Sequence, residues 1–114
     1  MPTLKILTNV EIPAVQRKRI LEAASSRVAD ILGKPEGYVM VMLQNNPDML
    51  FAGDDAPLAY LELTSLGLPE DTTPALSAVL CEFLEEHFGV PRGRTYIKFA
   101  SPPRHMFGWN GGTF

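Results

Sequence analysis

The chain has 114 residues, the size of a single domain, and carries a net charge of −3. Hydrophobic residues make up 46% and charged residues 20%, which indicates a soluble globular fold rather than a disordered chain. The acidic balance argues against a nucleic-acid partner, because such binding usually needs a basic face. No run of 18 apolar residues is present, so no membrane span is expected.

The cysteine content and the start of the chain argue against a disulfide-linked, metal-binding or secreted protein. Cys81 is the only cysteine, so no internal disulfide can form, and no Cys/His cluster has the spacing of metal ligands. We therefore expect neither a metal ion nor a cofactor. No basic segment followed by an apolar core opens the chain, so we expect no secretory signal and a cytoplasmic protein.

The first eight residues place Pro2 directly after Met1 and before a strand-like apolar run, residues 3–8. If Met1 is removed, Pro2 becomes a secondary amine at the end of a strand, and such an amine can act as a base. The alternative is that the Met-Pro start has no chemical meaning, since a single residue match is weak evidence. At this point both interpretations stay open.

A helix is predicted from Pro13 to about Leu32, because apolar residues recur there on one face at helical spacing. Gly33 is expected to end this helix in the left-handed conformation, and Pro35 cannot continue it. The next strand is predicted over residues 38–43, with apolar side chains at both odd and even positions.

The second half repeats this order after a polar loop over residues 45–57. We expect a strand over residues 58–66, then a helix with Thr73 as N-cap and Pro74 at its first position, ending near Phe88. A last strand is predicted over residues 95–99, where side chains alternate between two faces.

The two halves are related by a constant offset of about 56 residues, since Gly33-Lys34-Pro35 corresponds to Gly89-Val90-Pro91. We therefore expect one domain over residues 1–114, with pseudo-repeats over about 2–45 and 57–101. Two βαβ units predict an α+β fold, a four-stranded sheet with two helices on one face. The other face is then expected to be apolar and to bind further copies of the chain.

The tail, residues 102–114, is predicted to form a hairpin, because Asn110-Gly111 favours a tight turn. It is rich in large apolar side chains. It either packs on the sheet edge of its own chain, or packs on a neighbouring subunit or lines a pocket.

Short motifs along the whole chain resemble the tautomerase superfamily, and within it the family of macrophage migration inhibitory factor and D-dopachrome tautomerase. No one motif is decisive, but their order and spacing together are specific. The matching segments are Met1-Pro2, Thr8-Asn9-Val10, Gly33-Lys34-Pro35, Ser65-Leu66-Gly67, Leu80-Cys81, Tyr96-Ile97, Gly108-Trp109-Asn110 and Thr113-Phe114.

The resemblance implies a homotrimer in which three sheets form a central barrel and the active sites lie between subunits. It implies a keto–enol tautomerase of the phenylpyruvate type, with Pro2 as general base after removal of Met1 and a small keto or enol acid as substrate. The alternative is a cytokine-like protein ligand that acts by binding a receptor, with weak tautomerase activity. Members of this family can also leave the cell by a non-classical route.

The resemblance also assigns substrate-binding residues. Lys34 would hold the substrate carboxylate, and Tyr96 of a neighbouring subunit would add a hydroxyl or a ring edge. Lys98 stands where the family's cytokine has asparagine, and it either joins the site or turns to solvent. The apolar wall would comprise Leu66, Phe107, Trp109 and Phe114.

Overall fold

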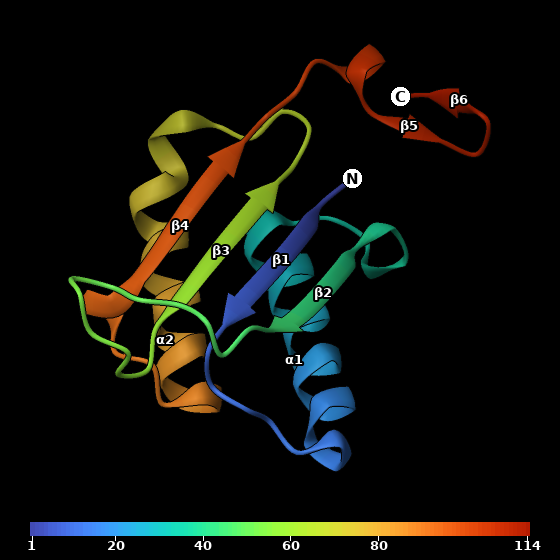
Figure 1. Ribbon diagram of the computed structural model, residues 1–114. Helices are drawn as coiled ribbons and strands as arrows, with labels where there is room; N and C mark the ends of the chain where they lie inside the picture. The colour runs from blue at the N-terminus through green and yellow to red at the C-terminus, as the bar shows by residue number, and fades with distance from the viewer.

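Two strand–helix–strand units follow one another in the computed structural model, which describes residues 1–114 (Figure 1). The first consists of β1 (Thr3–Thr8), α1 (Ala14–Leu32) and β2 (Met40–Asn45). The second consists of β3 (Ala59–Thr64), α2 (Thr73–Phe88) and β4 (Thr95–Ala100), followed by a hairpin of β5 (Gly108–Trp109) and β6 (Gly112–Thr113). Neither α1 nor α2 has the length and apolar character needed to cross a membrane.

The four long strands form one mixed sheet in the order β2-β1-β3-β4. Strand β1 runs parallel to β2 and antiparallel to β3, and β3 runs parallel to β4. Both helices lie on the same side of this sheet (Figure 1). The predicted α+β fold with two βαβ units and a C-terminal hairpin is therefore confirmed.

Gly33 ends α1 as expected, and Gly89 ends α2 in the same way. Gly33 follows α1 with φ of 61°, and Gly89 follows α2 with φ of 66°. A side chain with Cβ is strained in this left-handed region, so glycine lets the chain turn back toward the sheet.

The hydrophobic core fills the space between the sheet and the two helices. Alternate residues of the central strands point into it, because side chains of a strand alternate between its faces. The buried core residues are Leu4, Ile6, Ile12, Ile20, Ala24, Val28, Ala59, Leu61, Leu63, Leu76, Leu80, Phe83, Leu84, Phe88 and Val90. Cys81 is also buried, as expected for a small hydrophobic side chain.

Several predicted boundaries were wrong by one or two residues. Strand β2 starts at Met40 rather than Tyr38, because residues 36–38 form a 3-10 turn in which the Tyr38 amide donates to the Pro35 carbonyl at 3.1 Å. Strand β3 is shorter than the predicted residues 58–66. The six residues of β1 pair with six residues of β2 and with six residues of β3, and this pairing sets the length of β2 and β3. The N-cap of α2 is Thr72, one residue before the expected position.

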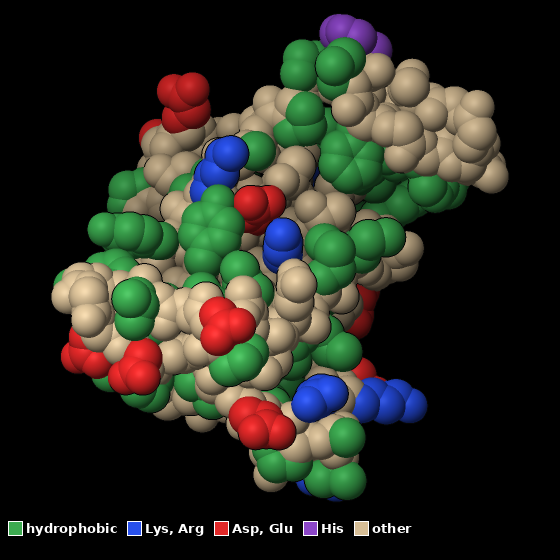
Figure 2. Space-filling view, in the orientation of Figure 1, with side chains coloured by type: hydrophobic (Ala, Val, Ile, Leu, Met, Phe, Trp, Pro, Cys, Tyr) green, Lys and Arg blue, Asp and Glu red, His purple; other side chains and the backbone are tan.

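The open face of the sheet is less apolar than predicted. Met40 and Met42 do point outward, with exposed fractions of 58% and 40%, while Val41 and Leu43 pack against the core. The middle of the face, however, carries charge, and Figure 2 shows basic and acidic side chains among hydrophobic ones over the sheet. Strand register places four outward residues in one row, namely Met42, Lys5, Glu62 and Lys98.

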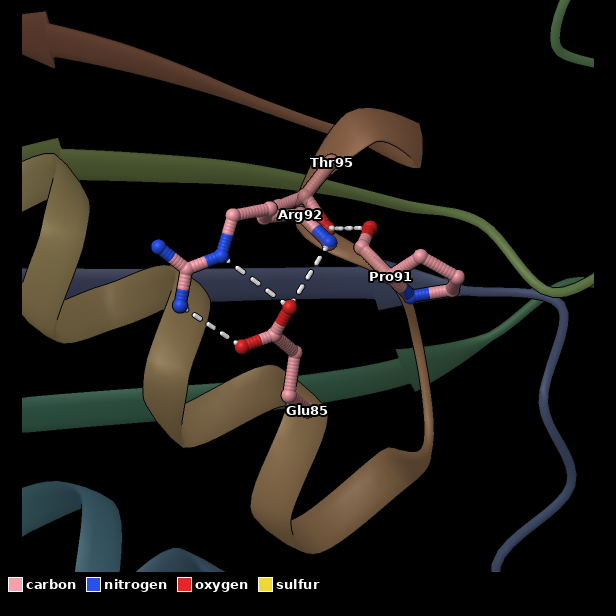
Figure 3. Close-up of polar contacts among 4 residues, drawn as sticks. All are labelled: Glu85, Pro91, Arg92 and Thr95. Atoms are coloured by element: carbon pink, nitrogen blue, oxygen red, sulfur yellow. Dashed lines mark hydrogen bonds and ion pairs between the residues drawn. The ribbon is translucent and has the colours of Figure 1, made fainter.

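An ion pair braces the connection from α2 to β4 (Figure 3). The Arg92 Nε and Nη2 atoms donate to the two Glu85 carboxylate oxygens at 3.1 and 2.8 Å, and the Arg92 amide donates to the same carboxylate at 3.2 Å. The Thr95 hydroxyl donates to the Pro91 carbonyl at 3.1 Å. The hydrogen bonds from Arg92 hold the pKa of the Glu85 carboxyl below its ordinary value.

Two buried hydroxyls differ in how they are satisfied. The Thr8 hydroxyl donates to the Leu58 carbonyl at 2.7 Å and accepts from the Val10 amide at 3.1 Å. The Ser65 hydroxyl is buried as deeply but has no hydrogen-bond partner. A buried polar group without a partner costs stability, because it has lost its hydrogen bonds to water.

We predict that Glu85→Gln lowers the melting temperature at pH 7 and that this difference fades in acid. The folded-state pKa is the lower one, so the carboxylate contributes stability above its unfolded pKa, and the contribution is lost as the pH falls through the folded pKa. Thermal unfolding followed by circular dichroism across this range tests it, with the exposed Glu22→Gln on α1 as control. An equal difference at every pH would contradict the prediction.

We predict opposite effects for the two hydroxyls. Thr8→Val should lower the free energy of unfolding by about 1–3 kcal/mol, because it removes the partner of two backbone groups. Ser65→Ala should leave it unchanged or raise it by up to about 1 kcal/mol, since no hydrogen bond is lost. Urea unfolding of both variants measures the difference. Equal destabilisation by both would show that Ser65 has a partner of its own.

Candidate active site

A cavity of about 240 Å³ opens beside the start of the chain, between β1, the turn before β2 and the C-terminal hairpin. Its lining is mostly hydrophobic and aromatic. The lining residues are Met1, Thr3, Gly37, Tyr38, Val39, Met40, Phe107, Gly108, Trp109 and Phe114. Figure 2 shows hydrophobic side chains gathered where the end of the sheet meets the C-terminal segment.

A second cavity, of about 140 Å³, adjoins the first and is more basic. It is lined by Met1, Lys34, Pro35, Tyr38, Leu66, Arg104 and Phe114. Three residues, Met1, Tyr38 and Phe114, line both cavities, so the two hollows meet at the first residue of the chain.

The hairpin contributes aromatic side chains to this site. Its turn residues Asn110 and Gly111 have φ of 51° and 78°, the left-handed values that the Asn-Gly signal predicts. Trp109 stacks on Phe114 with ring centroids 5.5 Å apart, and Tyr38 meets Trp109 edge-on at 5.8 Å. The tail therefore packs on its own chain beside the edge strand β2 and also lines a cavity there, so it combines parts of both alternatives from the sequence.

Lys34 is held at the smaller cavity by contacts at both ends. Its backbone amide donates to the Ala29 carbonyl at 3.0 Å as the chain leaves α1. Its side chain is partly buried, and Nζ donates to the Leu66 carbonyl at 2.9 Å. This long-range bond joins the turn after α1 to the segment that follows β3, so the ammonium is fixed rather than free in solvent.

The amino group that starts the chain lies in a basic, partly apolar environment. Burial lowers the pKa of the Met1 amine, and the positive charges of Lys34 and Arg104 lower it further. Pro2 is fully buried, and its carbonyl accepts from the Met40 amide at 3.0 Å. With Met1 attached, the Pro2 nitrogen is an amide and has no basicity.

Tyr96 and Lys98 do not reach this site within one chain. Both lie on β4, and β3 separates β4 from β1. Tyr96 is 66% exposed and packs against Phe51, with ring centroids 5.1 Å apart. Its register partner in β3 faces Leu7, so Tyr96 lies two strands away from Pro2 and five residues further along, roughly 10 Å across and 16 Å along the sheet.

Two residues at the site escaped the sequence analysis. Tyr38 was assigned to a strand, but its position in the turn after Pro35 brings its ring to both cavities. Arg104 lies in a segment with two prolines and no periodic pattern, so nothing local marked it. The smaller cavity is basic because Lys34 and Arg104, which are far apart in the sequence, both line it.

Comparisons with known proteins agree over the whole chain. The family model described as Macrophage migration inhibitory factor (MIF) matches residues 1–114. The macrophage migration inhibitory factor homolog of Trichuris trichiura is 35% identical over 115 residues, covering 100% of both chains. The macrophage migration inhibitory factor of Mus musculus is 30% identical, covering 100% of this chain and 99% of the mouse protein.

Solved structures resemble the fold equally closely. The crystal structure of the macrophage migration inhibitory factor homologue from Prochlorococcus marinus superposes with a TM-score of 0.91 and 38% identity, covering 98% of each chain. The macrophage migration inhibitory factor from Trichinella spiralis superposes with a TM-score of 0.90 and 32% identity, covering 98% of this chain and 99% of the other.

Proposed function

The chain belongs to the macrophage migration inhibitory factor family, and on that premise we propose that it is a phenylpyruvate-type keto–enol tautomerase with Pro2 as its general base. Membership of the family supports a tautomerase or cytokine-like function in general. The observation that carries the enzymatic proposal is the position of the chain start, where an aromatic cavity meets a basic one and where the pKa of the Met1 amine is lowered.

Removal of Met1 would leave the Pro2 nitrogen as a secondary amine at the junction of the two cavities. An ordinary amine is protonated at neutral pH and cannot accept a proton. At this end of the chain, burial and the charges of Lys34 and Arg104 lower the pKa of the Met1 amine, and the same surroundings would favour the neutral form of a Pro2 amine. A base with a pKa near the working pH is the most efficient in proton transfer.

The reaction moves one proton. The Pro2 nitrogen takes a proton from the carbon next to the substrate carbonyl, and the electron pair of that C–H bond forms the C=C bond of an enolate. The enolate oxygen then takes a proton from water and becomes the enol hydroxyl, while the Pro2 ammonium gives its proton to water and the base is restored. The reverse sequence gives the ketone. Lys34, held at the smaller cavity, would bind the substrate carboxylate and favour the negative charge that develops.

The apolar wall of this proposed site consists of Leu66, Phe107, Trp109 and Phe114, each of which lines one or both cavities. Such a wall excludes water, lowers the local dielectric and accommodates an aryl ring. Tyr38 belongs to the same wall by position.

Tyr96 and Lys98 would be supplied by a neighbouring subunit of a homotrimer. Two features support association. Strands β2 and β4 are both sheet edges with unpaired backbone groups, and such edges favour pairing with another chain. The methionines of β2 and the ring of Tyr96 are exposed on the open face. Lys98 would then either join the site or remain in the charged row with Glu62.

We predict that Pro2→Gly lowers kcat/KM for phenylpyruvate by about 10²–10⁴-fold, the usual contribution of a general base. Enol consumption followed by ultraviolet absorbance measures this, and the mass of the purified protein shows whether Met1 has been removed. The exposed Pro13→Gly serves as control, because Pro13 lies at the start of α1. Full activity in Pro2→Gly, or in protein that retains Met1, would refute the role of Pro2. If the protein is instead a cytokine-like ligand without catalysis, Pro2→Gly should leave its binding to a partner protein unchanged.

We predict that Lys34→Gln shifts the acidic limb of the pH–kcat/KM profile to higher pH. The Lys34 charge lowers the pKa of the Met1 amine, and we expect it to lower the pKa of a Pro2 amine in the same way. Loss of this charge then raises the pKa of the base, which becomes protonated at a higher pH than before. Lys18→Gln, on the exposed side of α1, removes the same charge far from the site and should leave the limb in place. If the acidic limb stays in place in both variants, the charge of Lys34 does not affect the pKa of the base.

A further inference from the structure

We propose that Arg104 is a second anion-binding residue of this site, which with Lys34 holds the carboxylate of a 3-aryl-2-oxo acid while the aryl group occupies the larger cavity. The inference rests on the proposed function and keeps its substrate class, and it adds Arg104 to the residues of the proposed site. It follows from the position of Arg104, from the charges around it and from the order of the two cavities.

The backbone around Arg104 is well fixed. Arg104 begins a 3-10 turn that ends at Met106, directly after Pro103. The Met106 amide donates to the Pro103 carbonyl at 2.8 Å, and the Phe107 amide donates to the Arg104 carbonyl at 3.2 Å. The Arg104 side chain therefore leaves a defined turn at the rim of the smaller cavity, where Lys34 also lies.

The guanidinium keeps most of its donors free. Its Nε donates to the main-chain oxygen of Phe114 at 3.3 Å, which orients the group. A guanidinium has five N–H donors, and this bond uses one of them. The two terminal amino groups remain available in the planar arrangement that matches a carboxylate.

No acidic side chain balances the two cations at the site. The ion pairs of the chain join Arg27 and His87 to Glu86, and Arg92 to Glu85, so they include neither Lys34 nor Arg104. No aspartate or glutamate lines either cavity. Arg104 is also close enough for its charge to lower the pKa of the terminal amine. The side chain of Lys34 meets only the Leu66 carbonyl, and Arg104 meets only the main-chain oxygen of Phe114, where a chain that ends at this residue carries its carboxylate. Lys34 and the terminal amino groups of Arg104 therefore remain for an anionic ligand beside the cavity.

The order of groups in a 3-aryl-2-oxo acid matches the order of the cavities. In such an acid the reacting carbon and the carbonyl lie between the aryl ring and the carboxylate. In the protein, the chain start lies between the aromatic cavity of about 240 Å³ and the basic cavity of about 140 Å³. A ligand with its ring in the first and its carboxylate in the second would place its reacting carbon next to Pro2.

Binding can be measured without catalysis, because Trp109 is the only tryptophan of the chain and lines the larger cavity. We would titrate the protein lacking Met1 with 3-phenylpropanoate and with the neutral 3-phenylpropanamide, and follow tryptophan fluorescence. Arg104→Gln should weaken binding of the carboxylate about tenfold or more and change binding of the amide by less than about twofold. The matched control is Arg19→Gln, on the exposed side of α1.

Equal weakening of both ligands would show that Arg104 only docks the hairpin through Phe114, and no weakening of either would show that it does not face the ligand. Both results overturn the inference. Turnover of phenylpyruvate and of its methyl ester separates this test from the proposed function. If Arg104→Gln loses its preference for binding the carboxylate, but the wild-type protein turns over no phenylpyruvate, the tautomerase proposal is refuted and the anion site is kept. Normal turnover, with an acid-to-ester ratio of kcat/KM that Arg104→Gln leaves unchanged, would keep the tautomerase and refute the role of Arg104.

Discussion

The pairing of β1 on both of its edges is the constraint on which the site depends. β2 holds it on one side and β3 on the other, each over six residues. The hydrogen bond from the Met40 amide to the Pro2 carbonyl extends this pairing by one residue, and the Pro2 ring is fully buried. The start of the chain, which in most proteins is mobile, is therefore held in one place. An amine can act as a base on a bound substrate only if it is positioned in this way.

Segments far apart in the sequence complete the site around that fixed end. Lys34 comes from the end of α1, Leu66 from the end of β3, and the aromatic rings from the last eight residues. The bond from Lys34 Nζ to the Leu66 carbonyl joins the two βαβ units at the smaller cavity. The same lysine lowers the pKa of the terminal amine. One contact thus contributes both to the position of the cation and to the electrostatics of the proposed base.

The open face of the sheet is apolar along β2, as its sequence pattern predicts, but charged over the other strands. The apolar residues of β2 correctly indicated a strand with an outward hydrophobic edge, seen in Met40 and Met42. The pattern of one strand carries no information about the outward side chains of its neighbours. Register places Lys5, Glu62 and Lys98 side by side across the middle of that face, so it is mixed in character. A surface of this kind suits an interface that includes water and charge better than a dry hydrophobic core.

The sequence by itself determined the elements and their order, because the signals for them are local. The glycines after each helix, the Asn-Gly turn and the alternation within strands depend on neighbours a few residues away. The family resemblance also named the apolar wall and Lys34. Only the tertiary structure decided that Tyr38 and Arg104 stand beside Met1, and that Tyr96 lies two strands away from Pro2. These facts depend on strand register and on contacts between distant segments, such as Arg104 with Phe114, for which the chain carries no local signal.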